Sequence, residues 1–211
     1  SVSYTEKARF LAELAQDDDS VISFAMIDPK GTYYLPDGKT FDVSGQKWFK
    51  ESEGGAHPYF SEPFKDIETG NLIVQAVVPI MGRNNAIVGS LAAVLDGYIL
   101  IDLVEDIKVG KTGNCYILSR SGVNIGNKNR TLVEQQFSAI EAAKTDKSFA
   151  DAAAFVEEIL KSDKTEIRYY SFMGSYNIAS TAVMETTGWI VGVEAPVKEF
   201  LGTINTMRTS I

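Results

Sequence analysis

Apolar and polar positions along this chain form a layout that occurs twice. Each copy opens on an apolar, strand-forming run, a short polar turn that contains glycine, and a second strand-forming run. The turns contain Gly31 and Gly122, and glycine readily takes the positive φ of tight turns, so both stretches are typical of β-hairpins. Both copies close on an apolar strand that runs into a helix-like segment, at 87–96 and 189–196. The pattern predicts two stacked α/β modules of similar design.

The first module should hold an antiparallel sheet with short helices. Pro63 marks an extended edge, because proline cannot donate a hydrogen bond to a sheet ladder. A helix before the sheet ends at the acidic run 17–19, and apolar residues at helical spacing lead toward the next module. The expected elements are a helix at 4–16, strands at 21–27, 31–34, 72–79 and 87–95, a short helix at 46–51, an extended edge at 59–63, a hairpin turn at 66–70 and a linker helix at 98–107.

The second module repeats this plan with longer helices. After its hairpin, two segments carry apolar residues at helical spacing, and Ser148 is placed to cap the second of them. Three further strands then complete the sheet. The expected elements are helices at 132–143 and 148–160 and strands at 166–172, 176–183 and 189–194.

Together these elements indicate an α+β fold of two tandem PAS-like modules, each an antiparallel sheet of about five strands with flanking helices. In such modules the sheet face and its crossing loops form a small-molecule pocket. The expected boundaries are 1–19 for the end of an N-terminal helical region, 20–109 for the first module with its linker helix, 110–196 for the second module, and 197–211 for a C-terminal helix.

Composition excludes several classes of function. The 211 residues carry a formal net charge of −8, which argues against a nucleic-acid platform, because such surfaces need clustered Lys and Arg. A single cysteine, Cys115, and a single histidine, His57, leave no internal disulfide, no Cys- or His-based zinc site and little basis for a Ser-His-Asp triad. No acid pair has a helical motif that places it beside a base. We therefore expect no enzymatic activity, no metal and no cofactor.

Two motif-like stretches do not change this view. Gly110-Lys111-Thr112 is similar to the end of a phosphate-binding loop, but the spaced upstream glycine is absent and a strand follows instead of a helix. The acidic run 17–19 lacks the alternating ligands and the glycine of a calcium loop, so a solvated turn is the better interpretation.

The chain shows neither a signal peptide nor an apolar run near the roughly 20 residues that span a bilayer. It begins and ends within helix-like segments, at 4–15 and 197–211, which look like cut points in a longer polypeptide. We therefore interpret the chain as an excised domain.

An ordered set of short motifs resembles the double Cache (dCache) sensor domains, which lie outside the membrane in bacterial and archaeal chemoreceptors, histidine kinases and cyclic-dinucleotide enzymes. The resemblance covers nearly the whole chain. Its landmarks are Gly31-Thr32-Tyr33-Tyr34, Asp37-Gly38, Gln46-Lys47-Trp48-Phe49, Ser61-Glu62-Pro63-Phe64-Lys65-Asp66, Thr69-Gly70, Val94-Leu95-Asp96, Gly110-Lys111-Thr112-Gly113, and Thr187-Gly188-Trp189 running to Ala195-Pro196.

The resemblance implies a cell-membrane receptor whose extracellular or periplasmic part this fragment forms. In the family, the membrane-distal module, here about 20–95, usually holds the small-molecule ligand. A long N-terminal helix pairs two protomers, so a homodimer is expected in the full receptor. The helix that leaves the second module feeds a membrane span. The implied function is non-catalytic ligand sensing of the chemoreceptor type.

The amino-acid-binding members share a pattern that transfers position by position. Their aromatic residue before the helix falls at Phe41, and their carboxylate-binding arginine falls at Gln46. The remaining matches are an aromatic pair at Trp48 and Phe49, a tyrosine position occupied by Phe64, and two amine-binding acids at Asp66 and Asp96. Tyr33, Tyr34, Tyr59 and Tyr98 are further candidates for the pocket wall.

This pattern retains the anionic half of an amino-acid site and lacks its cationic half. Two buried acids favour an ammonium or amine donor, and aromatic faces add cation–π attraction. Gln46 is neutral and cannot replace an arginine opposite a carboxylate. We therefore expect a small amine or N–H-rich ligand, such as a small amine or a nucleobase-like ring. Amino acids remain an alternative, if Lys47 or Lys65 assists Gln46.

Each of these residues also has a purely structural interpretation. Asp66 precedes a Thr-Gly turn that it can cap, and Asp96 can cap the helix that follows it. Trp48 and Phe49 can be core residues. The competing functions are thus a sensor for amino acids or nucleobases in a histidine kinase or cyclic-dinucleotide enzyme, and an interaction module without a ligand.

Overall fold

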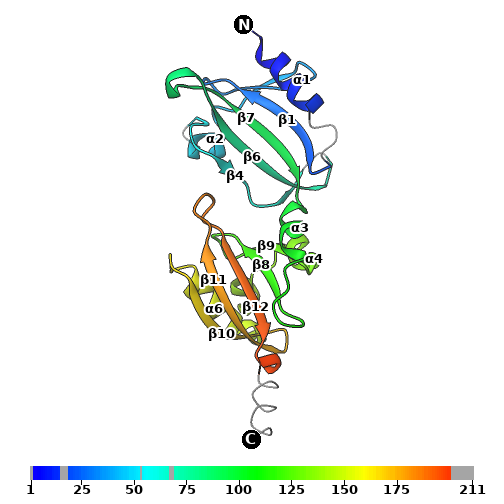
Figure 1. The fold of residues 1–211 in the computed structure, drawn as a ribbon, viewed down its shortest axis with the longest axis vertical. Coiled ribbons are helices and arrows are strands. Elements are labelled where there is room, and N and C mark those ends of the chain that lie inside the picture. The colour runs from blue at the N-terminus through cyan, green and yellow to red at the C-terminus, as the bar shows by residue number, and fades with distance from the viewer. Residues whose placement is uncertain (1, 15–18, 53, 67–68, 201–211) are drawn as a thin grey trace, which may run out of the picture. The chain divides into compact units, whose positions relative to one another are not determined.

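The structure is a computed structural model that describes residues 2–14, 19–52, 54–66 and 69–200. The chain divides into two compact units, Ser1–Ile99 and Leu100–Ile211, here called the N-terminal and C-terminal units. Each unit is built on one antiparallel sheet with helices packed against it (Figure 1). The predicted α+β fold of two tandem modules is confirmed.

The N-terminal unit contains a seven-stranded sheet in the order β3-β2-β1-β7-β6-β4, with β5 also paired to β6. The long strands β6 and β7 lie in the interior of the sheet, where each has neighbours on both sides, and many of their apolar residues are buried. Its strands are β1 (Val21–Ile27), β2 (Thr32–Tyr34), β3 (Thr40–Asp42), β4 (Tyr59–Phe60), β5 (Phe64–Lys65), β6 (Leu72–Met81) and β7 (Ile87–Asp96), and a 3₁₀ turn, η1 (Arg83–Asn85), joins the last two.

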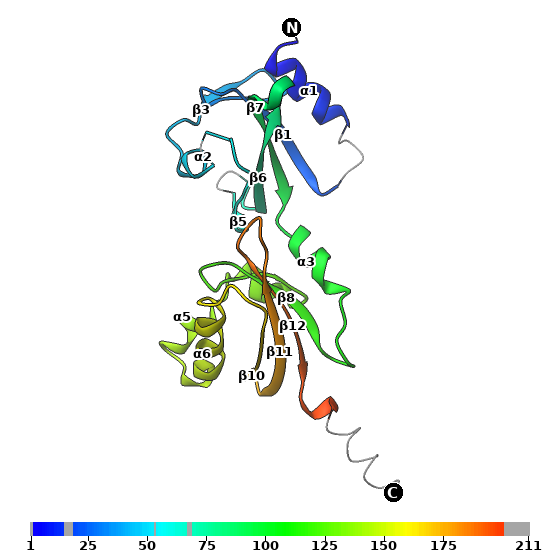
Figure 2. The same ribbon diagram turned by 60° about the vertical axis from the view of Figure 1, so that its left-hand side comes forward.

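Two helices lie on opposite faces of this sheet (Figures 1 and 2). α1 (Tyr4–Leu14) is fixed by the Tyr4 hydroxyl, which donates to the carbonyl of Val88 at 2.6 Å. The Tyr4 ring also stacks on that of Tyr34, with ring centroids 5.1 Å apart. On the other face, α2 (Lys47–Glu51) packs through Phe49 against a core cluster. That cluster consists of Ala25, Ile27, Phe49, Val77 and Ala92, with Tyr33, Leu35, Val43, Trp48 and Tyr59 packed around it.

The C-terminal unit contains a five-stranded sheet in the order β10-β11-β12-β8-β9. Helices α5 and α6 cover one face of this sheet (Figure 2). Its elements are α3 (Ile99–Glu105), β8 (Asn114–Leu118), β9 (Asn124–Asn127), α4 (Arg130–Glu134), α5 (Ala139–Ala143), η2 (Lys147–Phe149), α6 (Ala150–Ile159), β10 (Glu166–Phe172), β11 (Ser175–Val183) and β12 (Ile190–Pro196).

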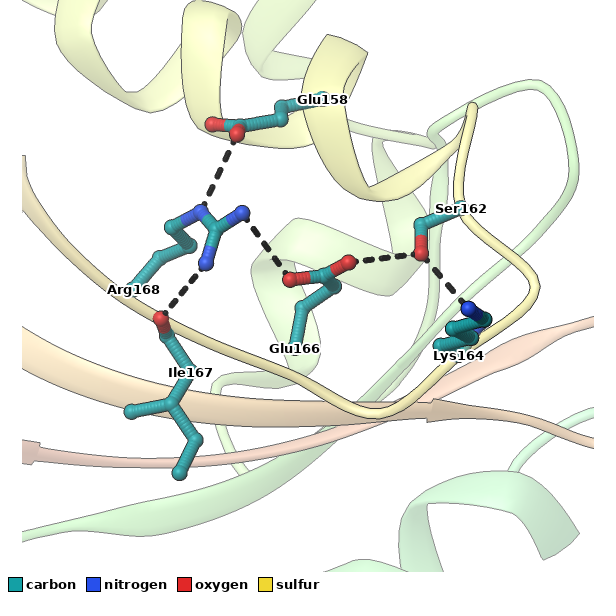
Figure 3. Close-up of polar contacts among 6 residues, drawn as sticks. All are labelled: Glu158, Ser162, Lys164, Glu166, Ile167 and Arg168. Carbon is teal, nitrogen blue, oxygen red and sulfur yellow. Dashed lines mark hydrogen bonds and ion pairs between the residues drawn. The ribbon is translucent and has the colours of Figure 1, made fainter.

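A charged network joins α6 to the edge strand β10 (Figure 3). Arg168 donates from Nε to Glu158 at 3.1 Å and pairs through Nη2 with Glu166 at 3.0 Å. Glu166 in turn accepts from the hydroxyl of Ser162 at 2.8 Å, in the loop between the two elements. These partly exposed pairs each stabilise the fold only modestly, and the Arg168–Glu158 pair links α6 to β10.

The sequence-based prediction of one helix over 132–143 is wrong. The structure forms α4 and α5 with a break between them, where Gln136 adopts a positive φ of 49°. Ser138 then caps α5 by accepting from the backbone of Glu141. The proposed capping role of Ser148 is also wrong, because Asp146 accepts from the Ser148 backbone N–H and initiates this segment. The short strand β3 was not predicted.

Candidate ligand-binding site

Strand register gathers the predicted aromatic residues on the α2-covered face of the N-terminal sheet. Tyr59 of β4 is paired with Val77 of β6, and Val77 with Ala92 of β7. At the other edge, Phe41 of β3 is paired with Tyr33 of β2. Directly paired residues share a face of a sheet, and the core cluster places Val77, Ala92 and Tyr33 on the side of α2. Phe41 and Tyr59 therefore belong to this face.

Trp48, Phe49 and Tyr59 form the aromatic part of the site. Trp48 meets Phe49 edge-on, with ring centroids 5.7 Å apart, and lies 6.3 Å from the ring of Tyr59. Phe49 is buried beneath them, whereas Trp48 and Tyr59 are half-buried and keep part of each ring accessible. Burial raises the pKa of Tyr59, and the nearby charges of Glu51 and Glu62 raise it further. The Tyr59 hydroxyl therefore remains a neutral hydrogen-bonding group.

The two acids lie at one end of the same face. Ile73 of β6 is paired with Phe64 on one side and with Asp96 on the other. Asp66 lies two residues beyond Phe64, and its backbone N–H donates to the carbonyl of Asn71 at 2.8 Å, which extends this pairing. Side chains two residues apart point to the same face, so Asp66 and Asp96 share it. They are separated by two strand spacings across the sheet and two residues along it, or about 12 Å between their Cα atoms.

Both acids also cap local backbone. Oδ2 of Asp66 accepts from the N–H and the hydroxyl of Thr69, at 3.0 and 2.6 Å. Oδ1 of Asp96 accepts from the N–H of Tyr98 at 2.9 Å. Both side chains are half-buried. Each carboxylate can accept further hydrogen bonds through its remaining lone pairs, so the turns fix the position of each acid without using all of its capacity.

Gln46, Phe41 and Phe64 are the more exposed members of the predicted set. Gln46 is the N-cap residue of α2, and its side chain makes no capping hydrogen bond. Phe41 and Phe64 expose 53% and 39% of their surfaces, which is high for phenylalanine and leaves apolar area for another group to cover. Phe41 and Phe64 lie at opposite edges of the sheet, so each can contact only a ligand near its own edge.

Tyr34 lies outside this group. It follows Tyr33 on β2 and therefore points to the opposite face, where it stacks on Tyr4 and its hydroxyl donates to Asp28 at 3.1 Å. Tyr33, also a candidate, packs against the core cluster on the α2-covered face, and burial raises its pKa. Gln75 was not singled out from the sequence. It lies two residues from both Ile73 and Val77 on β6, so its half-buried amide side chain points to the same face as theirs.

Neither lysine considered as a substitute for the missing arginine lies against the acids. Lys47 forms an i,i+4 pair with Glu51 at 3.5 Å on the surface of α2. Lys65 is paired with Leu72, which places it on the opposite face from Phe64 and Ile73. The described part of the chain holds no cluster of three His, Cys, Asp or Glu side chains that fits a metal ion. The polar chemistry of this face is thus carried by carboxylates, amides and hydroxyls.

Comparison with known proteins agrees with this architecture. The family model for the Cache domain, dCache, matches residues 2–204, and the chain belongs to this family. The resemblance inferred from the sequence motifs is thereby confirmed. Within the described ranges, no helix has the length and apolar character that a membrane span requires.

A curated relative and two solved structures illustrate the family. The chain is 19% identical over 176 residues to the methyl-accepting chemotaxis protein McpG of Pseudomonas putida, and this match covers 83% of the chain. The match covers only 25% of McpG, so the chain spans about a quarter of the length of this relative.

The fold is shared with two chemoreceptor ligand-binding domains. The domain of CtaA from Pseudomonas fluorescens, in complex with L-leucine, has a TM-score of 0.64 at 19% identity and covers 94% of this chain and 80% of its own. The domain of PctB from Pseudomonas aeruginosa, in complex with L-Arg, has a TM-score of 0.63 at 13% identity, with coverages of 100% and 79%. At these identities the likeness shows the fold alone.

Proposed function

We propose that this chain is the extracellular ligand-binding sensor domain of a membrane receptor, with its ligand site on the α2-covered face of the N-terminal unit. The placement of Asp66 and Asp96 on the sheet face that also carries an accessible aromatic cluster supports this proposal. Membership of the dCache family and the likeness to chemoreceptor domains support the sensor role. The domain acts by binding and performs no chemistry on its ligand.

The charges on this face favour an amine or another N–H-rich ligand. Two acids with Cα atoms about 12 Å apart can both accept from a ligand that lies across Ile73. A cationic end gains further attraction from the faces of Trp48 and Tyr59. The position opposite a ligand carboxylate is held by the neutral Gln46, so a carboxylate adds little affinity.

Amino acids are the second candidate class of ligand. The solved complexes of CtaA with L-leucine and of PctB with L-Arg show that related folds bind amino acids. Gln46 makes no capping hydrogen bond, so its amide can turn toward a carboxylate. The two ligand classes differ in whether the ligand needs a carboxylate. An amine ligand binds without one, whereas an amino-acid site loses much of its affinity for a ligand that lacks it.

A homodimer is the expected form of the full receptor. Phe10 and Leu14 on α1 are 59% and 66% exposed, an apolar surface that a second protomer can cover. Sensing then requires only that the ligand binds one arrangement of the protomers more tightly than another. A dimerisation module without a ligand is the alternative function that the same surface favours.

A thermal-shift screen of amines, amino acids, nucleobases and carboxylates tests the proposal. A hit at 100 times its Kd should stabilise the N-terminal unit by about 2.7 kcal/mol. Asp66→Asn and Asp96→Asn keep the size of the side chain but remove its charge, and should abolish the shift. Asp37→Asn is the matched control, because Asp37 also caps a turn, through the N–H of Lys39 at 3.0 Å.

The pattern of hits separates the candidate functions. Amines that stabilise the protein without a carboxylate support the proposed ligand class, and Gln46→Arg should then add amino acids to the hits. Stabilisation by carboxylates alone contradicts the amine assignment. A shift that survives both Asp→Asn variants places binding elsewhere, and the absence of any hit favours the dimerisation module.

A further inference from the structure

The C-terminal unit contains a small, partly open cavity on the helix-covered face of its own sheet. The cavity has a volume of about 40 Å³, and most of its wall is aromatic or aliphatic, with Phe137, Phe155 and Phe172 among the lining residues. One buried water needs about 10–15 Å³ of such space, so the cavity has room for about three non-hydrogen atoms. The polar groups of Tyr116, Tyr170 and Glu194 also line it.

Small residues on the central strands make room for these polar side chains. Tyr116 is paired with Gly192, and a Cβ atom at Gly192 would lie 2.3 Å from the Tyr116 ring. Glu194 is paired with Ala179 on the next strand. The ring of Tyr170 is held by Phe155, on which it stacks at a centroid distance of 4.1 Å. The arrangement therefore depends on glycine and alanine at two central positions of the sheet.

Glu194 is a carboxyl group held in surroundings that do not favour its charge. It accepts hydrogen bonds from the Tyr170 hydroxyl and from the side chain of Asn114. Burial raises the pKa of Glu194, although these two donors and the charge of Lys128 act in the opposite direction. The Lys128 ammonium donates to the carbonyl of Thr112 at 3.1 Å, at the rim of the site. A cation inside the cavity would stabilise the charged form of Glu194.

Tyr116 contributes a buried hydroxyl whose hydrogen bonding within the protein is poor. Its side chain is 5% exposed, and Tyr170 is its polar neighbour, but among the described residues no group forms a hydrogen bond of good geometry with Tyr116 Oη. Buried hydroxyls are almost always paired with protein or water, so a molecule bound in the cavity can supply the better partner. Tyr116 therefore marks a second point, besides Glu194, at which a bound molecule is expected to make a hydrogen bond.

The cavity has a route to solvent. A polar groove of about 360 Å³ lies beside it and shares Asn127, Phe172 and Glu194 with the cavity wall. The groove is also lined by Asn177 and Lys128. A polar molecule can therefore approach Glu194 through a hydrated groove before it enters the apolar interior.

We propose that this cavity is a second ligand site, which binds a small alkylammonium cation such as methylammonium or ethylammonium. The ammonium group donates to Glu194 and to the oxygen of Tyr116, and the short alkyl group contacts the phenylalanine wall. The aromatic faces favour a cation over a neutral guest of the same size. The site lies wholly within the C-terminal unit and is independent of the site proposed on the N-terminal sheet.

Isothermal titration calorimetry of the whole chain with methylammonium chloride tests this proposal, with sodium chloride at equal ionic strength as the blank. Glu194→Gln keeps the size and accepting oxygen of the side chain but removes its charge. It should weaken binding by about tenfold or more, as expected when one charge of a desolvated pair is removed. Ala152→Val should also weaken binding, because Ala152 lines the cavity and is 2% exposed.

Control variants test whether methylammonium binds at this cavity. Ala154→Val changes an exposed position of the same helix and should leave binding intact. A chain carrying both Asp66→Asn and Asp96→Asn should still bind methylammonium, which separates this site from the N-terminal one. The proposal is overturned if methylammonium does not bind, if the double variant abolishes binding, if adding Glu194→Gln to the double variant leaves its binding unchanged, or if acetate binds equally well.

Discussion

Asp66 and Asp96 combine a structural role with a proposed binding role. Asp66 accepts a hydrogen bond from the backbone N–H of Thr69, three residues ahead, and Asp96 accepts one from that of Tyr98, two residues ahead. Such a bond fixes the carboxylate before any ligand arrives, which lowers the entropy cost of binding. The local capping interpretation is therefore compatible with a ligand-binding role, and only the removal of charge at constant size separates the two.

The buried Glu194 carboxyl should make stability depend on pH in a defined direction. Burial raises its pKa in the folded state, so the folded protein binds this proton more tightly than the unfolded chain does. Stability conferred by the protonated form is complete below the unfolded pKa and is lost as pH rises through the folded pKa. Tyr116, Tyr170 and Lys128 are the other titratable groups facing it.

We therefore expect Glu194→Gln to gain stability relative to the parent as pH rises from about 4 toward 8, since the introduced amide cannot ionise. Thermal melting followed across this range measures the difference between the two proteins. Glu157→Gln, an exposed change on α6, is the control and should show no such trend. A difference between Glu194→Gln and the parent that stays constant or shrinks with rising pH would contradict the assignment.

At the scale of elements, the segment after β12 is attached to the loop before β8. The carboxylate of Glu199 accepts from the backbone N–H groups of Lys111 and Thr112, at 2.6 and 3.0 Å, and from the Thr112 hydroxyl. Gly110, with a φ of 63°, permits this approach, because a Cβ there would lie 2.5 Å from Glu199 Oε2. The Gly-Lys-Thr stretch thus binds a carboxylate of its own chain.

We expect Glu199→Ala to release this loop. The amides of Lys111 and Thr112 should exchange with solvent about tenfold faster, the change that corresponds to losing a hydrogen bond to a charged group. Hydrogen exchange followed by NMR measures both amides directly, with Lys198→Ala as the control. Unchanged exchange at both amides would show that the attachment does not persist in solution.

Hydrogen bonding by Thr112 and Lys111 lowers the pKa of Glu199, so the attachment should be complete above the ordinary glutamate pKa. It should weaken as pH falls through the lowered value, in the opposite sense to the effect of Glu194.

Most elements were predictable from the sequence, including the short helix α2, but strand β3 and the break between α4 and α5 were not. The strands 21–27 and 166–172 begin and end where predicted, because turn residues bound each apolar run. Strand β3 has three residues and no repeating pattern, so only its pairing with β2 defines it. The break in 132–143 depends on the positive φ of Gln136, which no local residue preference indicates.

The residues of the candidate site, too, could be predicted from the sequence only in part. The family pattern named the acids and most of the aromatic residues that share this sheet face, and their role in ligand binding stays a prediction. Tyr33 and Tyr34 were both candidates, and the structure places only Tyr33 on this face. A shift of one residue along a strand exchanges the two faces of a sheet, and three residues are too few to show the alternation. Glu194 was missed altogether, since only the three-dimensional packing of Tyr116 and Tyr170 around it distinguishes it from a surface glutamate.

At the scale of the whole molecule, two units of one fold family carry different chemistry on their covered faces. The N-terminal sheet presents Asp66, Asp96 and accessible aromatic rings, whereas the C-terminal sheet holds Glu194 at the wall of a mostly apolar, partly open cavity. The single tryptophan of each unit, Trp48 or Trp189, allows the two to be followed separately in one sample. Trp48 belongs to the aromatic cluster of the proposed ligand site.

Fluorine NMR of protein labelled with 5-fluorotryptophan, titrated with the best amine from the thermal-shift screen, tests the central claim most directly. The Trp48 resonance should shift with saturation, and it should stop shifting in a chain that carries Asp66→Asn and Asp96→Asn. A titration that leaves the Trp48 resonance in place, or a shift that persists in the double variant, would contradict the assignment of the ligand site to the N-terminal sheet.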